Sequence, residues 1–193
     1  MAAMDISRLI DGFRLPEAIP LMQKAVEIRE LVDHILKAAP DPGKGKKHGG
    51  GDDLADEEEP ENISLALQQQ MDEMHLNSML IPAKIVGAEG GDIYDLRMEN
   101  ATLIRKAARE LVVGLRGLEI FGYDEQPYFN LLREEMEEFR MLFIAWVQAF
   151  DLKRFIADDW GLFNPPGVNP GDDTIGDLGD DEDDDEDDNP YDD

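Results

Sequence analysis

Apolar residues recur at the three- and four-residue spacing of an α-helix along four stretches of this chain, and no stretch shows the alternation of a half-buried strand. These stretches predict helices from Pro16 or Pro20 to Ala39, from Asn62 to Val86, from Asp92 to Phe121 and from Asp124 to Ala157. The short link between the last two predicts an antiparallel helical hairpin. We therefore expect an all-α, up-down four-helix bundle, with room for a short extra helix over residues 5–10.

The fourth stretch has the longest uninterrupted apolar row, with steps of three and four residues. The row consists of Phe129, Leu132, Met136, Phe139, Phe143, Trp146 and Phe150. Residues with this repeat share one side of a helix, and in a bundle that side faces the core. We expect Phe143 and Trp146 to be core residues.

Several residues mark predicted helix ends and interruptions. Asp92, with Asp95 three residues later, has the pattern of an N-cap with a capping box and predicts the start of the third helix. Pro82 lacks an N–H group, so we expect it to kink the second helix or to end it early. Gly114 and Gly117 each weaken the third helix by about 1 kcal/mol relative to alanine, which indicates that another helix approaches closely there.

Charge is distributed unevenly along the chain. The 193 residues include 45 acidic and 18 basic ones, which gives a formal net charge of −27. Fourteen of the acidic residues, and no basic one, lie between residues 172 and 193. Residues 40–61 run from a basic patch into an acidic one, and neither segment has an apolar pattern that could offset the entropy lost on ordering. We expect a disordered inter-helix loop at 40–61 and a disordered acidic C-terminal tail at 172–193.

These features predict one helical domain with appendages. Its parts are an N-terminal segment (1–15), the bundle (16–157), a linker with aromatic residues and prolines (158–171) and the acidic tail (172–193). The acidity argues against direct binding of nucleic acid or of an anionic membrane, because both need Lys and Arg. The absence of cysteine excludes disulfides, thiolate nucleophiles and zinc–sulfur sites. Neither a signal peptide nor a membrane span is evident, so we expect a cytoplasmic protein.

Histidines and carboxylates offer one candidate metal site. A carboxylate-bridged pair of metal ions in a helical bundle uses Glu-x-x-His on two helices and further glutamates on the others. Asp72 and His75 have this three-residue spacing on the second helix, and Glu134 and Glu138 on the fourth could add carboxylates. The motif does not repeat with the same spacing, so solvated surface residues are the simpler interpretation. We expect no cofactor.

A second enzyme hypothesis comes from Arg29-Glu-Leu-Val-Asp-His34 on the first helix. This hexapeptide resembles the Arg-x(4–6)-His motif of HEPN-type helical ribonucleases. The resemblance implies acid–base chemistry by His34 and stabilisation of phosphate charge by Arg29. It covers six residues, and the motif lies in the first helix, whereas that family typically carries it late in its bundle.

Three groups of residues could contact a protein partner. Arg105, Arg109 and Arg116 project from one face of the third helix, where ion pairs with glutamates of the fourth helix are the simpler interpretation and an anchor for an acidic segment is the alternative. The aromatic residues Trp160 and Phe163 could dock on a partner, although docking on their own domain is favoured. The acidic tail, with Asp183, Asp184 and Asp185 at its centre, could contact a basic partner.

These observations favour a non-enzymatic interaction or regulatory protein. Its expected partner is a protein, basic if the tail makes the contact, and a homodimer is compatible with the pattern. A regulatory subunit, an antitoxin-like inhibitor, an assembly factor and a nucleic-acid mimic all fit this class. A small bundle enzyme is the alternative, either the ribonuclease or the metal site described above. Adaptation to high salt is a third interpretation of the acidity, and the concentration of charge in one tail argues against it.

Overall fold

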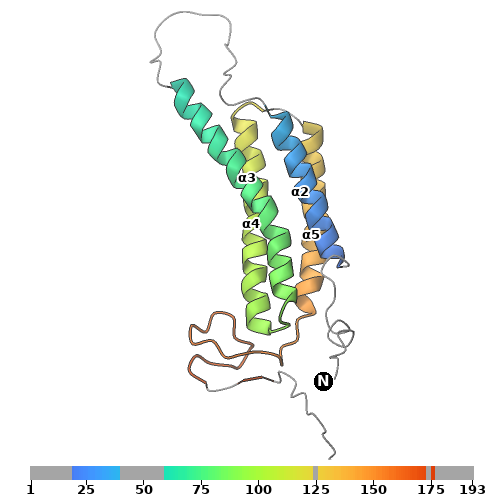
Figure 1. The fold of residues 1–193 in the computed structure, drawn as a ribbon, viewed down its shortest axis with the longest axis vertical. Helices are drawn as coiled ribbons and strands as arrows, with labels where there is room; N and C mark the ends of the chain where they lie inside the picture. Colours follow the sequence, from blue (N-terminus) through green and yellow to red (C-terminus); the bar gives the residue numbers. More distant parts are fainter. Residues whose placement is uncertain (1–18, 40–58, 124–125, 173–174, 177–193) are drawn as a thin grey trace, which may run out of the picture.

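The computed structural model describes residues 19–39, 59–123, 126–172 and 175–176, with the side chains of the second helix described from residue 65. These residues form four helices: α2 (Pro20–Ala38), α3 (Glu59–Glu89), α4 (Tyr94–Ile120) and α5 (Gln126–Gln148). The helices run alternately up and down beside one another (Figure 1). Within the described ranges there is no strand, only an isolated bridge between Ile156 and Ile175. The prediction of an all-α, up-down bundle is confirmed.

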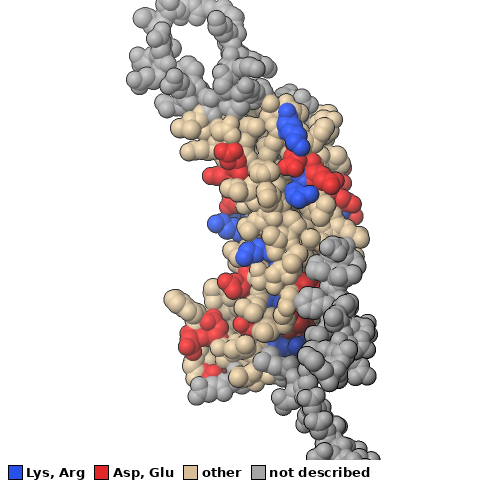
Figure 2. Space-filling view, viewed as in Figure 1, with Lys and Arg blue, Asp and Glu red and all other residues tan. Residues whose placement is uncertain are grey.

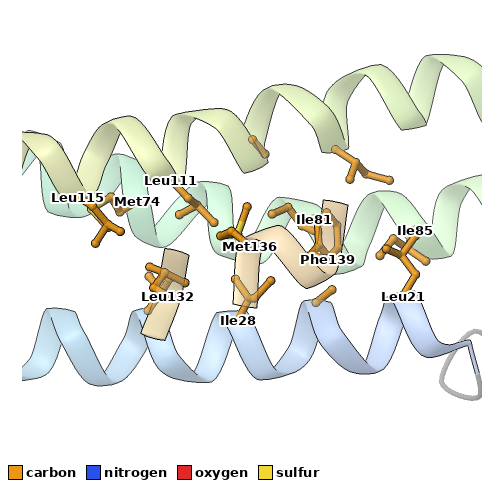
Figure 3. Packing of buried hydrophobic residues seen from close by; sticks show 14 of the residues in the cluster. Leu21, Ile28, Met74, Ile81, Ile85, Leu111, Leu115, Leu132, Met136 and Phe139 are labelled. Atoms are coloured by element: carbon orange, nitrogen blue, oxygen red, sulfur yellow. The ribbon is translucent and has the colours of Figure 1, made fainter. Parts of the chain in front are cut away.

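The helices form a ring in which each helix has two neighbours. α2 packs against α3 and α5, and α3 packs most closely against α4, whereas α4 and α5 are the loosest pair. The core between them holds apolar residues from all four helices, among them Ile28, Ile81, Leu111 and Leu132 (Figure 3). Burying a side chain of this kind contributes about 1.5–3 kcal/mol, and this burial is what selects the observed face of each helix.

The two glycines of α4 allow its close contact with α3. A Cβ atom at Gly114 would overlap the side chain of Met74, and one at Gly117 would lie 2.7 Å from Oε1 of Gln70. A side chain at Gly114 would therefore meet buried Met74, whereas one at Gly117 would have to displace the end of the Gln70 side chain. The close helix approach expected from these glycines is confirmed, and α3 is the partner helix.

We expect Gly114→Ala to lower the free energy of unfolding by about 1–2 kcal/mol. Alanine favours the helix by about 1 kcal/mol, but overpacking a buried contact typically costs about 1–3 kcal/mol. Chemical denaturation followed by circular dichroism measures the difference. Gly117→Ala is the matched comparison, because the far end of Gln70 can move aside, and it should cost less. A stabilised Gly114→Ala variant would contradict the close contact.

Three expected helix limits differ in the structure. α5 ends at Gln148 and not near Ala157, because the N–H groups of Ala149 and Phe150 turn back to the carbonyls of Trp146 and Val147. The expected N-cap at Asp92 is wrong: the N-cap is Ile93 without a side-chain hydrogen bond, and Asp92 has a φ of +47°. Of the two effects expected of Pro82, the early end is wrong, because α3 contains Pro82 and continues past the expected limit at Val86 to Glu89.

Both carboxylates of the expected capping box bind other groups. Asp92 accepts hydrogen bonds from Arg97 and Arg154, and Asp95 accepts one from the backbone N–H of Ile156. These contacts attach the segment after α5 to the start of α4. The two carboxylates therefore make tertiary contacts in place of the local capping hydrogen bonds that were expected.

The segment that follows α5 folds against one end of the bundle (Figure 1). Phe150 and Phe155 are buried there, and the N–H of Gly176 donates to the carbonyl of Phe155 at 2.8 Å. The expected short helix at residues 5–10, most of the 40–61 loop and the tail beyond residue 176 lie outside the described residues.

Candidate functional site

A groove with a volume of about 640 Å³ runs between α4 and α5, the loosest pair of helices. Its α4 side consists of Arg105, Ala108, Arg109, Val112, Val113 and Arg116. Its α5 side consists of Arg133, Met136, Glu137, Phe139, Arg140, Phe143 and Ile144. The groove therefore combines an apolar floor with several arginines.

The groove is hollow because the apolar side chains on its two walls differ in size. α4 contributes the short side chains of Ala108 and Val112, while α5 contributes the rings of Phe139 and Phe143. Phe139 and Phe143 stack with their ring centroids 6.2 Å apart. Trp146 is buried as expected, whereas Phe143 packs against the core but is only half-buried, with part of its ring at the groove.

Five arginines surround this floor. Arg105, Arg109 and Arg116 come from α4, as the sequence predicted for one face of that helix, and Arg133 and Arg140 come from α5. Arg109 and Arg116 are seven residues apart, as are Arg133 and Arg140, a separation of about 10.5 Å along a helix. Both walls of the groove thus carry cations at the same spacing.

The glutamates of α5 have other partners than the arginines of α4. Glu135 and Glu138 bind Lys24 of α2 at 2.6 and 2.8 Å, and Glu137 pairs with Arg140 on its own helix. Within the described ranges, Arg105, Arg109 and Arg116 form no ion pair with these glutamates or with other residues. The interpretation that they pair with glutamates of α5 is wrong, because Glu135 and Glu138 bind α2, and Glu137, which lines the groove, pairs with Arg140 instead.

The ion pairs that do form shift the pKa values of their members. Hydrogen bonds to Glu135, Glu138 and Glu27 raise the pKa of Lys24. The Arg133 guanidinium, 2.5 Å from Glu119, lowers the pKa of that carboxyl, and Glu137 raises the pKa of Arg140. These shifts keep Lys24 and Arg140 protonated and Glu119 ionised near neutral pH. Glu119 and Glu137 balance two of the five arginines, so the groove keeps an excess of positive charge on a strongly acidic protein.

A different distribution of charge occurs on the side of the bundle that α3 covers. Figure 2 shows this side with mostly uncharged surface and with scattered groups of both signs. Exposed apolar residues of α3, such as Leu76 and Met79, contribute to its uncharged surface. Among its described residues, the face in Figure 2 therefore has no arginine cluster like the one described for the groove.

The structure does not bring Arg29 and His34 together as the ribonuclease resemblance implies. A separation of five residues on a continuous helix places two side chains about 140° apart around its axis. The ring of His34 packs against Tyr128 of α5, with the centroids 4.8 Å apart. His34 is exposed and Arg29 is half-buried, and neither lines the groove.

The four candidate metal ligands are also apart. His75 Nδ1 lies 3.2 Å from Asp33 Oδ1 of α2, and Asp72 accepts a hydrogen bond from Gln68. Glu138 binds Lys24 on the other side of α2, and Glu134 is exposed. α3 and α5 lie opposite each other in the ring, so the candidate ligands of α3 are separated from those of α5. Among the residues whose placement is described, no three metal-binding side chains gather.

The two linker aromatics differ in exposure. Trp160 is 90% exposed, so the expectation that it docks on its own domain is wrong, while Phe163 is half-buried. Trp160 follows Asp158 and Asp159, and the Asp158 carboxylate accepts a hydrogen bond from its backbone N–H. This hydrogen bond fixes the turn, but it leaves the indole ring exposed. Asp183, Asp184 and Asp185 lie outside the described residues.

Sequence reasoning identified the α4 arginines but missed Arg133, Arg140 and the exposure of Phe143. The seven-residue spacing of Arg133 and Arg140, equal to that of Arg109 and Arg116, was the available signal.

None of the four described helices has the length and apolar character needed to cross a membrane. Comparison of the chain with models of protein families, with curated proteins and with solved structures finds no match.

Proposed function

We propose that this chain is a non-enzymatic interaction protein and that the groove between α4 and α5 binds a ligand that is both apolar and anionic. The observation that carries the proposal is the combination of an apolar floor with five arginines, three of which have no ion-pair partner among the described residues. A pocket lined by apolar groups with a few charged groups at its edge is the usual form of a binding site.

The apolar floor and the arginines of the groove each favour binding of such a ligand. Covering exposed apolar surface is favourable by about 25 cal/mol per Å². An anion also relieves the mutual repulsion of the arginines, and a charge-assisted hydrogen bond to a guanidinium is about twice as strong as a neutral one. A wholly apolar ligand would lack the second contribution, and a small hydrophilic anion would lack the first.

A second surface supports the earlier hypothesis of a basic partner. Trp160 is 90% exposed and has Asp158 and Asp159 next to it in the sequence. An exposed tryptophan beside carboxylates suits a cationic partner, because the ring stacks on Arg or Lys and the carboxylates pair with them. We keep this surface as a secondary proposal. The net charge of −27 opposes self-association, so a homodimer is the less favoured partner.

We expect 8-anilinonaphthalene-1-sulfonate, an apolar anion, to bind the protein with one-to-one stoichiometry in a fluorescence titration. The Val113→Glu variant should weaken binding about tenfold or more, because it places a like charge at the edge of the groove. Val113 is 56% exposed, so the substitution leaves the core intact.

The matched control is Val86→Glu, which replaces a 46% exposed valine of α3 outside the groove. This variant should bind the dye as the wild type does, and circular dichroism should show unchanged helix content for both variants. Equal dye binding by the wild type and Val113→Glu would refute the groove as the binding surface.

A further inference from the structure

We infer that the occupant of the groove is an acidic amphipathic helix of a partner protein, an inference that rests on the proposed function. The groove lies between two antiparallel helices and has the shape that a third helix fills. Partners bound in this way place apolar anchors at positions i, i+3, i+4 and i+7 into a groove between helices. The packing of the bundle, the spacing of the arginines and the charge of the chain each support this choice.

The packing leaves one side of the ring open. α2–α3, α3–α4 and α2–α5 are closed by direct helix contact, and only α4–α5 is loose. The short, half-buried side chains of Ala108 and Val112 leave part of the Phe143 ring uncovered, so this part of the floor is accessible to a partner. A helix placed there would contact both walls at the usual interaxial distance of about 8–10 Å.

The spacing of the arginines matches the repeat of a helix. Arg109 and Arg116 on one wall, and Arg133 and Arg140 on the other, are each about 10.5 Å apart along the groove. Acidic residues at positions i and i+7 of a bound helix have the same separation, and the residues between them would face the apolar floor. Because Arg133 and Arg140 already pair with Glu119 and Glu137, the unpaired Arg109 and Arg116 specify an apolar stripe with Glu or Asp on the flank that faces α4.

The same spacing disfavours two other anionic ligands. A fatty acid carries a single carboxylate and would pair with the arginines at only one end of the groove. The acidic tail of this chain, residues 177–193, has twelve carboxylates but only Leu178 and Tyr191 as apolar or aromatic residues. It therefore lacks the apolar stripe that the floor requires. A partner helix supplies both the stripe and the repeated carboxylates.

The test uses a fluorescently labelled 18-residue peptide with leucines at every third and fourth position and glutamates at i and i+7 on one flank of the leucine stripe. We expect saturable binding in fluorescence anisotropy, together with a gain of peptide helicity in circular dichroism. Arg109→Glu should weaken binding about tenfold or more, and affinity should fall as salt rises. Lys106→Glu is the matched control, because Lys106 is exposed on the same helix but does not line the groove, and it should change affinity less than about twofold.

Two further ligands separate the possible occupants. A peptide with glutamine in place of every glutamate should bind at least about tenfold more weakly, and dodecanoate should not displace the acidic peptide at comparable concentration. Equal affinity of the glutamate and glutamine peptides, or equal loss in Arg109→Glu and Lys106→Glu, would overturn the inference. Dye binding that depends on Val113 without peptide binding would refute the helix alone, whereas failure of both ligands would refute the proposed function as well.

Discussion

Replacing Arg97 with alanine is expected to lower the free energy of unfolding by about 3–5 kcal/mol, because it leaves a buried carboxylate without its cation. The Arg97 guanidinium lies 2.6 Å from Glu89 and 2.5 Å from Asp92. The side chains of Arg97 and Glu89 are only 12% and 9% exposed, so water does not replace the lost partner. This interaction joins the end of α3 to the start of α4.

Aromatic contacts strengthen the same cluster. Arg97 lies 4.2 Å from the ring centroid of Phe150, and the indole N–H of Trp146 donates to Glu89 at 2.8 Å. Removing the arginine therefore also removes a cation–π contact and uncovers two rings at the end of α5. One substitution disturbs three helices, which is why the expected loss is large.

Arg140→Ala is the control for this prediction. Arg140 pairs with Glu137 on its own helix, α5, where both side chains are exposed and water screens the ion pair, so its loss should change stability little. Urea denaturation of both variants, followed by circular dichroism at 222 nm, gives the two changes. Similar losses in Arg97→Ala and Arg140→Ala would contradict the structural role assigned to the buried cluster.

Phe129→Ala is expected to destabilise the protein by about 3–5 kcal/mol, the usual result of truncating a fully buried phenylalanine. Phe129 has no exposed surface and packs its ring against Tyr123, with the centroids 5.4 Å apart. The hydroxyl of Tyr123 in turn donates to the carbonyl of Ile35 at 3.1 Å. The cavity left by the ring would therefore loosen the contact between α5 and the end of α2.

Phe143→Ala provides the internal comparison, because both residues belong to one apolar row of α5. Phe143 is half-buried at the groove, so its truncation should cost about 1–2 kcal/mol, in proportion to the smaller area removed from water. Thermal and chemical denaturation measure both losses. An equal cost for the two substitutions would mean that the groove is closed in solution.

The helices could be predicted from the sequence because their periodicity depends on the chain alone. Their ends were less predictable, since tertiary contacts decided them. Asp92 and Asp95 have the spacing of a capping pair, yet ion pairs and a backbone contact from residues 154 and 156 use their carboxylates. Likewise the apolar row continues to Phe150, but Phe150 is buried beyond the last turn of α5.

The candidate site was predictable only in part for a related reason. The sequence places Arg105, Arg109 and Arg116 on one face of α4, but it does not say which neighbour that face meets. The answer depends on the rotation of α5, which turns Glu135 and Glu138 toward Lys24 and leaves Arg133 and Arg140 beside the groove. The rotation of one helix relative to another is set when the two pack, so the sequence pattern of a single helix does not predict it.

The tight contact at Gly114 and Gly117 has a consequence for how the molecule moves. Helices that interlock closely open together, whereas loosely packed neighbours separate at a lower free energy. α3 and α4 therefore form the most tightly joined pair of the bundle, whereas α4 and α5 have the fewest contacts. The α4–α5 seam, which contains the groove, is expected to open at a lower free energy than the glycine contact, and amide hydrogen exchange should be faster along it.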